Sequence, residues 1–193
     1  MRVSREKAAE NRERVVAVAA EQFRAHGFDG IGVADLMKAA GLTHGGFYGQ
    51  FASKDDLAAE AATRAFAETT ASLRTRALAT DDPFATAVSL YLSAAHRDSP
   101  DRGCAIAALS QDAARGSPKL RAAFEAGIGG YLELIEELSG GTREQATAIY
   151  ATLVGGLTLA RTVTDPALSD AILASTKAAA LAMRNSASNP LRS

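Results

Sequence analysis

Apolar residues recur every three or four positions along most of the chain, which is the spacing of one buried face of an α-helix. The clearest stripe runs from Leu120 through Phe124 and Tyr131 to Leu138, and no segment shows the alternation of a half-buried strand. The pattern therefore predicts an all-α protein. We expect about nine helices, over residues 5–26, 33–40, 43–51, 53–79, 83–95, 104–115, 118–139, 142–163 and 166–184.

Residues that favour helix ends lie between these stripes. Thr142 with Gln145, and Ser53 with Asp56, have the spacing of capping boxes at helix starts. Asp-Pro and Ser-Pro pairs predict further starts, and glycines predict the stops. These pairs and glycines are Asp82-Pro83, Ser117-Pro118, Asp165-Pro166, Gly27, Gly41 and Gly140-Gly141.

The segment Gly41–Phe51 departs from good helix-forming sequence. Thr43 is placed to cap a helix, yet Gly45 and Gly46 would occupy its first turn, and each glycine costs about 1 kcal/mol of helix propensity relative to alanine. Glycines also let a backbone approach a partner closely. With 33–40, the segment has the helix-turn-helix pattern, so we hypothesise that it enters the DNA major groove.

Within this segment, Phe47 and Phe51 are spaced to anchor a third helix on the other two. That leaves His44, Gly45, Tyr48 and Gly49 for the opposite side. Lys54 follows in the first turn of the next helix, where a cation opposes the helix dipole. It fits a phosphate contact there, and a solvated lysine is the alternative.

Composition and charge add limits on the class of protein. The net charge is −1, so only a local field at a contact face would attract DNA. One cysteine allows no internal disulfide, the N-terminus has no signal-peptide core, and 146–160 is too short to span a membrane. We expect a cytoplasmic protein with no membrane association.

An enzyme is the rival class. The sequence shows no paired carboxylates and no nucleophile–base motif, and His26, His44 and His96 lack ligand spacing. We therefore expect no catalysis, no metal and no cofactor.

The N-terminal third resembles the tetracycline-repressor (TetR/AcrR) family. The matching stretches are Phe23-Arg-Ala-His-Gly-Phe28, Val33-Ala-Asp-Leu36, Ala40-Gly-Leu-Thr-His-Gly-Gly-Phe-Tyr48 and Phe51-Ala-Ser-Lys-Asp-Asp-Leu57. The resemblance implies a helix-turn-helix DNA-binding domain over 1–52 and a helical effector-binding and dimerisation domain over 53–184, with a tail over 185–193 that we expect to be disordered. It implies a homodimeric repressor that binds a palindromic operator, dimerises through 142–163 and 166–184, and is released by a small-molecule effector.

The same resemblance assigns roles within the DNA-binding segment. Thr43 would hold the helix start and touch a phosphate, His44 and Gly45 would face bases, and Tyr48 and Lys54 would contact phosphates. The sequence departs from the family pattern at two positions: Gly32, where threonine is frequent, and Gly49, where a larger polar residue is frequent. Gln50 could compensate for Gly49, with DNA shape supplying the rest.

The second domain offers a less specific set of expected pocket residues. Aromatic and apolar positions there suit either a ligand pocket or plain core, namely Phe84, Tyr91, Cys104, Phe124, Tyr131 and Leu153. Cys104 could also sense an oxidant or electrophile, but a small buried filler is the simpler interpretation. A regulator whose second domain only dimerises is the remaining alternative.

Overall fold

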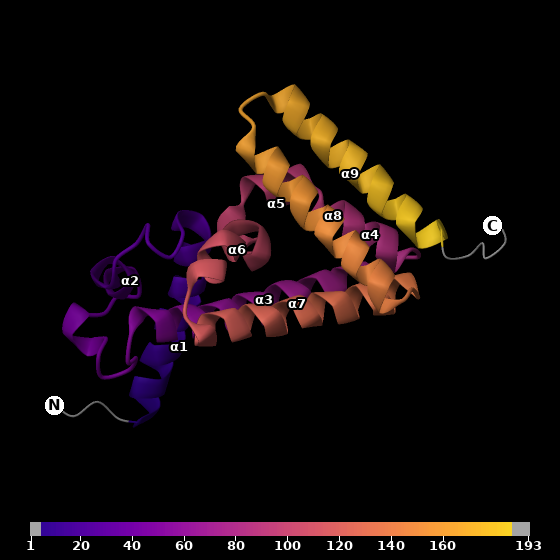
Figure 1. Cartoon of the computed structure of the whole chain (residues 1–193). Coiled ribbons are helices and arrows are strands. Elements are labelled where there is room, and N and C mark those ends of the chain that lie inside the picture. Colours follow the sequence, from indigo (N-terminus) through magenta and orange to yellow (C-terminus); the bar gives the residue numbers. More distant parts are fainter. Residues whose placement is uncertain (1–4, 187–193) are drawn as a thin grey trace. The chain divides into compact units, whose positions relative to one another are not determined.

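The structure, a computed structural model, describes residues 5–186, and these residues form α-helices and two short 3₁₀ helices without a strand (Figure 1). The predicted all-α class is confirmed. Of the predicted tail, residues 185 and 186 belong to the last helix and the remainder lies outside the described residues. The helices are α1 (Arg5–His26), α2 (Val33–Ala39), η1 (His44–Gly46), α3 (Lys54–Leu78), α4 (Pro83–Tyr91), α5 (Ala94–Asp98), η2 (Pro100–Arg102), α6 (Ala105–Arg115), α7 (Pro118–Ser139), α8 (Arg143–Thr162) and α9 (Pro166–Ser186).

Most helix ends follow the caps predicted from the sequence. Thr142 and Gln145 form both halves of a capping box at α8, and the Asp82 carboxylate accepts the Ala85 N–H at 3.0 Å at the start of α4. Gly27, Gly41 and Gly140 have φ of 79°, 71° and 68°, the left-handed conformation that ends a helix and that glycine adopts most easily.

Two predicted helices are wrong. The segment 43–51 forms only the 3₁₀ helix η1 followed by a turn, because three glycines there contribute little helix propensity. The segment 83–95 is divided into α4 and α5, because Ser93 has extended backbone and its hydroxyl accepts the His96 N–H at 3.1 Å, which starts a new helix. These two differences offset each other, so the described residues still contain nine α-helices.

The chain divides into two compact units. The first comprises residues up to Ala67 together with Cys104–Gly127. In it α6 packs on α1, and the Asp112 carboxylate accepts the Phe28 N–H at 3.4 Å. Edge-to-face aromatic contacts link Phe23 to Phe28, Phe28 to Phe124, and Phe124 to Phe66.

The second unit comprises Glu68–Gly103 and the chain from Ile128 onward. Its aromatic core contains Tyr91, Tyr131 and Tyr150, the last two stacked at 4.9 Å between ring centroids. The helices α8 and α9 run side by side (Figure 1), and Gly156 gives them their close approach, since a Cβ there would lie 2.4 Å from Thr176. No helix in the described range is both long and apolar enough to cross a membrane.

Candidate nucleic-acid interface

A glycine turn joins α2 to the predicted DNA-binding segment. The Gly41 N–H donates to the Lys38 carbonyl at 2.9 Å, and the Leu42 N–H donates to the Met37 carbonyl at 2.8 Å. This pair of bonds, with φ of 71° at Gly41, is a Schellman motif. It ends α2 sharply and turns the chain into η1.

The segment itself is held by short-range backbone bonds of 3₁₀ type. The Gly46 N–H donates to the Thr43 carbonyl at 3.0 Å, and the Phe47 N–H donates to the His44 carbonyl at 3.1 Å. Thr43 has the extended backbone of an N-cap, but its side chain forms no capping hydrogen bond. The predicted side-chain cap is therefore wrong, and the Thr43 backbone carbonyl accepts the Gly46 N–H instead.

Two phenylalanines anchor this segment to the rest of the first unit, as predicted. Phe47 and Phe51 are buried, and their ring centroids lie 5.5 Å apart. The Arg12 guanidinium of α1 lies 4.8 Å above the Phe51 ring and pairs with Glu60 of α3 at 2.6 Å. The segment is therefore fixed on its inner side by apolar packing and by a cation–π contact.

The outer side of the segment is open to solvent. Thr43, His44, Gly45 and Gly49 are exposed, and Tyr48 is the most exposed large hydrophobic residue in the described part of the chain, at 69%. The Tyr48 ring contacts the His44 ring edge-to-face at 6.1 Å. The structure thus brings five of the seven predicted DNA-binding residues onto one exposed surface, hereafter the reading face.

Nothing inside the protein requires glycine at positions 45 and 49. Neither residue has positive φ. A Cβ at position 45 would meet no atom within 4 Å, and one at position 49 would make only an ordinary 3.7 Å contact with the Gly46 carbonyl oxygen. Both glycines thus lower helix propensity without any gain in internal packing.

The remaining two predicted residues, Gln50 and Lys54, differ in position. Gln50 is half-buried, and its side-chain amide donates to the Gly46 carbonyl at 3.3 Å. Lys54 is the first residue of α3 and has no ion pair or hydrogen bond with another described residue. Its neighbour Asp56 is engaged with Lys119 and with the Ser53 hydroxyl, and the hydrogen bond from Lys119 is the main reason that the pKa of Asp56 is lowered.

Two arginines of α1 position the segment without a signal in the sequence pattern. Besides Arg12, Arg14 donates to the Ala40 carbonyl at the end of α2 at 3.4 Å. Both lie on the polar face of an amphipathic helix, where arginine ordinarily faces solvent, so the sequence pattern carries no signal for either contact.

Four of the six predicted pocket residues gather in the second unit. Phe84, Tyr91, Tyr131 and Leu153 line a small apolar cavity of about 10 Å³. Cys104 and Phe124 belong to the first unit and do not line it. Cys104 is 1% exposed, which suits the filler interpretation over an accessible sensing thiol. The cavity has room for about one water-sized sphere.

Comparison with known proteins gives independent evidence on the first unit. Residues 15–61 match the family model described as "Bacterial regulatory proteins, tetR family". By sequence search, no protein of curated function matches the chain.

Solved structures share the fold over nearly the whole chain. A TetR transcriptional regulator from Chloroflexus aurantiacus is 27% identical with a TM-score of 0.73, covering 90% of this chain and 95% of that one. NemR of E. coli in its reduced form is 22% identical with a TM-score of 0.74, covering 89% and 95%. A TetR-family regulator from Cytophaga hutchinsonii is 20% identical with a TM-score of 0.74, covering 94% and 98%.

The glycine turn, the short segment after it and the matched residues 15–61 define a helix-turn-helix DNA-binding protein. The fold of the whole chain is that of TetR-family transcriptional regulators, and the family-model match over residues 15–61 lies in its helix-turn-helix part.

Proposed function

We propose that the reading face, with Gln50 and Lys54 beside it, binds operator DNA, and that the chain acts as a homodimeric repressor. The observation that carries this proposal is the pair of glycines at 45 and 49. They have no conformational or packing role in the fold, and their bare backbone suits close approach to a groove. Tyr48 and Lys54 flank them as donors for phosphates.

The domain assignment belongs to the same proposal. We assign DNA binding to residues 1–52, and dimerisation and effector response to 53–184. A transcription factor of this family works on the bacterial chromosome, so we propose a cytoplasmic location.

The dimer would form through α8 and α9. Small side chains follow one exposed face of α8, and Leu159 and Leu168 are 58% and 48% exposed near the loop between the two helices. Small residues allow close helix packing, and exposed leucines favour burial against a second copy. The small residues that follow this exposed face of α8 are Ala148, Ala151, Gly155 and Thr158.

Release by a small effector requires a change in the second unit. The cavity between Phe84, Tyr91, Tyr131 and Leu153 is far smaller than the roughly 300–1,000 Å³ of a typical ligand pocket. We propose that the described conformation is the effector-free one, and that an effector binds by opening this apolar cavity. A ligand that binds the open form more tightly would shift the population toward it.

The small cavity also favours a second candidate, a regulator whose second domain only dimerises. The two candidates differ in one measurable property. Compounds that raise the melting temperature and release DNA support effector control, whereas a screen of apolar compounds in which neither occurs supports the second candidate.

Selection of bound fragments from random DNA tests the core of the proposal. We expect a palindrome whose half-site centres lie about 34–36 Å apart, protected by two copies of the chain. Asymmetric fragments bound by a single copy would contradict the dimeric repressor.

A further inference from the structure

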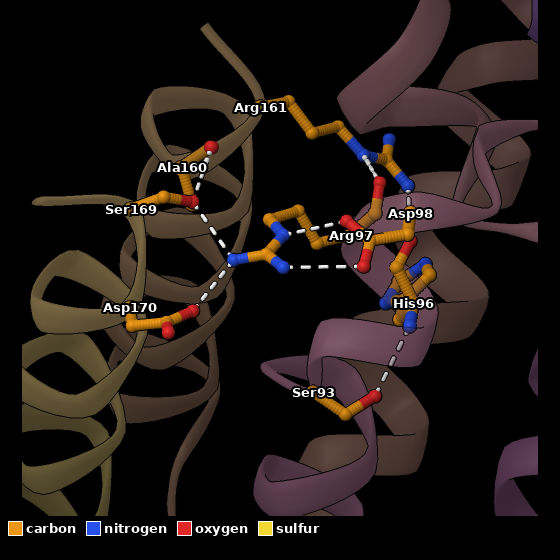
Figure 2. A network of polar contacts seen from close by, with 8 residues as sticks. All are labelled: Ser93, His96, Arg97, Asp98, Ala160, Arg161, Ser169 and Asp170. Atoms are coloured by element: carbon orange, nitrogen blue, oxygen red, sulfur yellow. Dashed lines mark hydrogen bonds and ion pairs between the residues drawn. The ribbon is translucent and has the colours of Figure 1, made fainter. Parts of the chain in front are cut away.

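A polar joint connects α5 to the α8–α9 pair. Figure 2 shows its members, contributed by three separate helices and the residue before α5: Ser93, His96, Arg97, Asp98, Ala160, Arg161, Ser169 and Asp170. All belong to the second unit. None of these contacts is used in the DNA-binding proposal.

Arg97 attaches α5 to the start of α9. Its guanidinium donates to the Ser169 hydroxyl at 3.0 Å and to Asp170 at 2.7 Å, and a further pair of bonds engages Asp98. The Ser169 hydroxyl in turn donates to the Ala160 carbonyl of α8 at 2.7 Å. The hydrogen bonds to Asp98 and Asp170 hold the pKa of Arg97 above its ordinary value, so this residue stays charged.

Arg161 attaches α8 to the backbone of α5. Its Nη2 donates to the His96 carbonyl at 2.6 Å, and its Nε donates to the Arg97 carbonyl at 3.1 Å. Arg161 lies in the last turn of α8, and these hydrogen bonds go to another helix. The joint therefore depends on a cation that donates to two backbone carbonyls of one short helix.

His96 lies at the centre of this joint. Its Nδ1 is 2.7 Å from the Tyr91 carbonyl oxygen, and a carbonyl only accepts, so Nδ1 carries the proton of the neutral ring. A proton that charges the ring must therefore go to Nε2. A Cβ at Gly103 would lie 2.6 Å from His96 Nε2 and 2.9 Å from Arg161 Nη2, so these two nitrogens are no more than 5.5 Å apart.

We propose that His96 is an acid-sensitive pin, meaning a residue that holds the joint together only while its ring is neutral. Protonation at Nε2 places a second positive charge beside Arg161. Arg161 then leaves the α5 carbonyls, and the α8–α9 pair separates from α5. This inference rests on the proposed function only for its last step, in which the freed pair changes the spacing of the two DNA-binding domains. Opening of the joint itself is independent of DNA.

The charged groups around His96 support this direction. From α8 it faces Arg161, and α4 carries no charged residue. On α5 itself Asp98 is held by Arg97, from α9 Asp170 is held by the same arginine, and in η2 Asp101 lies beside Arg102. The nearby carboxylates are thus already neutralised by arginines.

Burial and Arg161 also set the sign of the pH effect. Burial, the largest cause, and the charge of Arg161 lower the pKa of His96 below its ordinary value of 6.5, despite the opposing bond to Tyr91. The unfolded chain therefore takes up this proton first, and stability is lost as pH falls from about 6.5 toward the lower folded value. A surface groove of about 380 Å³ along Arg97, Asp98, Arg161 and Ser169 brings solvent to the joint.

The test compares wild type with His96→Asn, whose side-chain amide can still donate toward the Tyr91 carbonyl. His26→Asn is the matched control, because His26 is exposed at the end of α1. Between about pH 7.5 and about pH 5.5 we expect the melting temperature of wild type and of the control to fall about 2–4 °C more than that of His96→Asn. Amide exchange, corrected for the intrinsic effect of pH, should accelerate over 96–104 and 160–170 in wild type only.

Equal melting and exchange profiles for wild type and His96→Asn would overturn the pin. If His96→Asn does not fold, an NMR titration of the wild-type His96 imidazole replaces it, and a midpoint at or above the ordinary value of 6.5 contradicts the inference. Operator affinity is measured last. If operator affinity falls equally in wild type and His96→Asn as the pH is lowered, the link between the joint and DNA binding is overturned. If neither protein binds an operator at any pH, the proposed function is overturned, and the melting test of the joint still stands.

Discussion

Single residues of the reading face have roles that the fold alone does not explain. Gly45 is exposed, has no positive φ and would tolerate a Cβ without an internal contact. A glycine in such a place usually lowers stability through the entropy of the unfolded chain. We therefore infer that the missing side chain at position 45 serves the close approach of a partner, which we propose is DNA.

We therefore expect Gly45→Ala to separate stability from binding. Its free energy of unfolding in urea should stay within about 0.5 kcal/mol of wild type or rise. Its operator affinity in a gel shift should fall about tenfold, which corresponds to about 1.4 kcal/mol, because the methyl group holds the backbone away from DNA. Gly129→Ala, at an open glycine within α7, should leave operator affinity unchanged and be neutral or stabilising. Unchanged affinity of Gly45→Ala would remove the argument from the bare backbone.

Helices and their ends show how far the sequence determines the structure. Local chemistry specifies the caps at Asp82 and Thr142 and the glycine stops, so those boundaries were predictable. The spacing of Phe47 and Phe51 favours an α-helix over the η1 segment, whereas the glycines before and between them favour the short 3₁₀ helix that the structure has. The break at Ser93 depends on one hydroxyl that competes with the helix ladder, which periodicity does not reveal.

The predicted site shows the same difference between contacts that are local in the sequence and contacts that depend on the tertiary structure. Residues that lie close in sequence, such as His44 and Tyr48, were placed together correctly. Cys104 and Phe124 were grouped with Tyr91 only because all are apolar, and nothing in a stripe tells which compact unit a helix joins. The arginine contacts of Arg12 and Arg161 join distant helices, and only the tertiary structure reveals them.

Neighbouring glycines in α8 give a matched pair for the packing of α8 on α9. Gly156→Ala should lower the free energy of unfolding by about 1–3 kcal/mol, because its Cβ would lie 2.4 Å from Thr176 of the packed neighbour. Gly155→Ala has open space and should be neutral or stabilising. Urea unfolding at equal protein concentration measures both, and equal losses would contradict the packing described for α8 and α9.

The ends of α4 and α9 are joined by an ion pair with a defined pH signature. Arg184 binds both oxygens of Asp82 at 2.7 and 2.9 Å, and with the Ala85 N–H it lowers the pKa of Asp82 to about 2. A lowered carboxyl pKa contributes stability above the unfolded value of 3.8, and this is lost as pH falls from there to about 2. Arg184→Gln should therefore be less stable near neutral pH and lose less on acidification through that window. Parallel acid-unfolding curves for the two proteins would show that the pair contributes nothing.

At the scale of the whole molecule, the proposed repressor is a symmetric dimer that carries two reading faces. Gly155 is exposed on the face of α8 that we assign to the dimer. Gly155→Arg should convert the dimer to monomers in sedimentation velocity and lower operator affinity, because one half-site alone gives only part of the binding energy. Gly129→Arg, the same change at an open glycine of α7, should remain dimeric. A dimeric Gly155→Arg would place the interface elsewhere.

The most direct measurement of the central claim is a gel-shift titration with the double variant Tyr48→Phe/Lys54→Ala, on operator and on unrelated DNA, over a range of salt concentrations. Because we assign both side chains to phosphates, affinity should fall alike on all sequences, and the slope of log affinity against log salt should decrease by about 1. Arg76→Ala, which removes a cation from the opposite end of α3, should behave as wild type. Undiminished operator binding by the double variant would contradict the claim that this surface binds DNA.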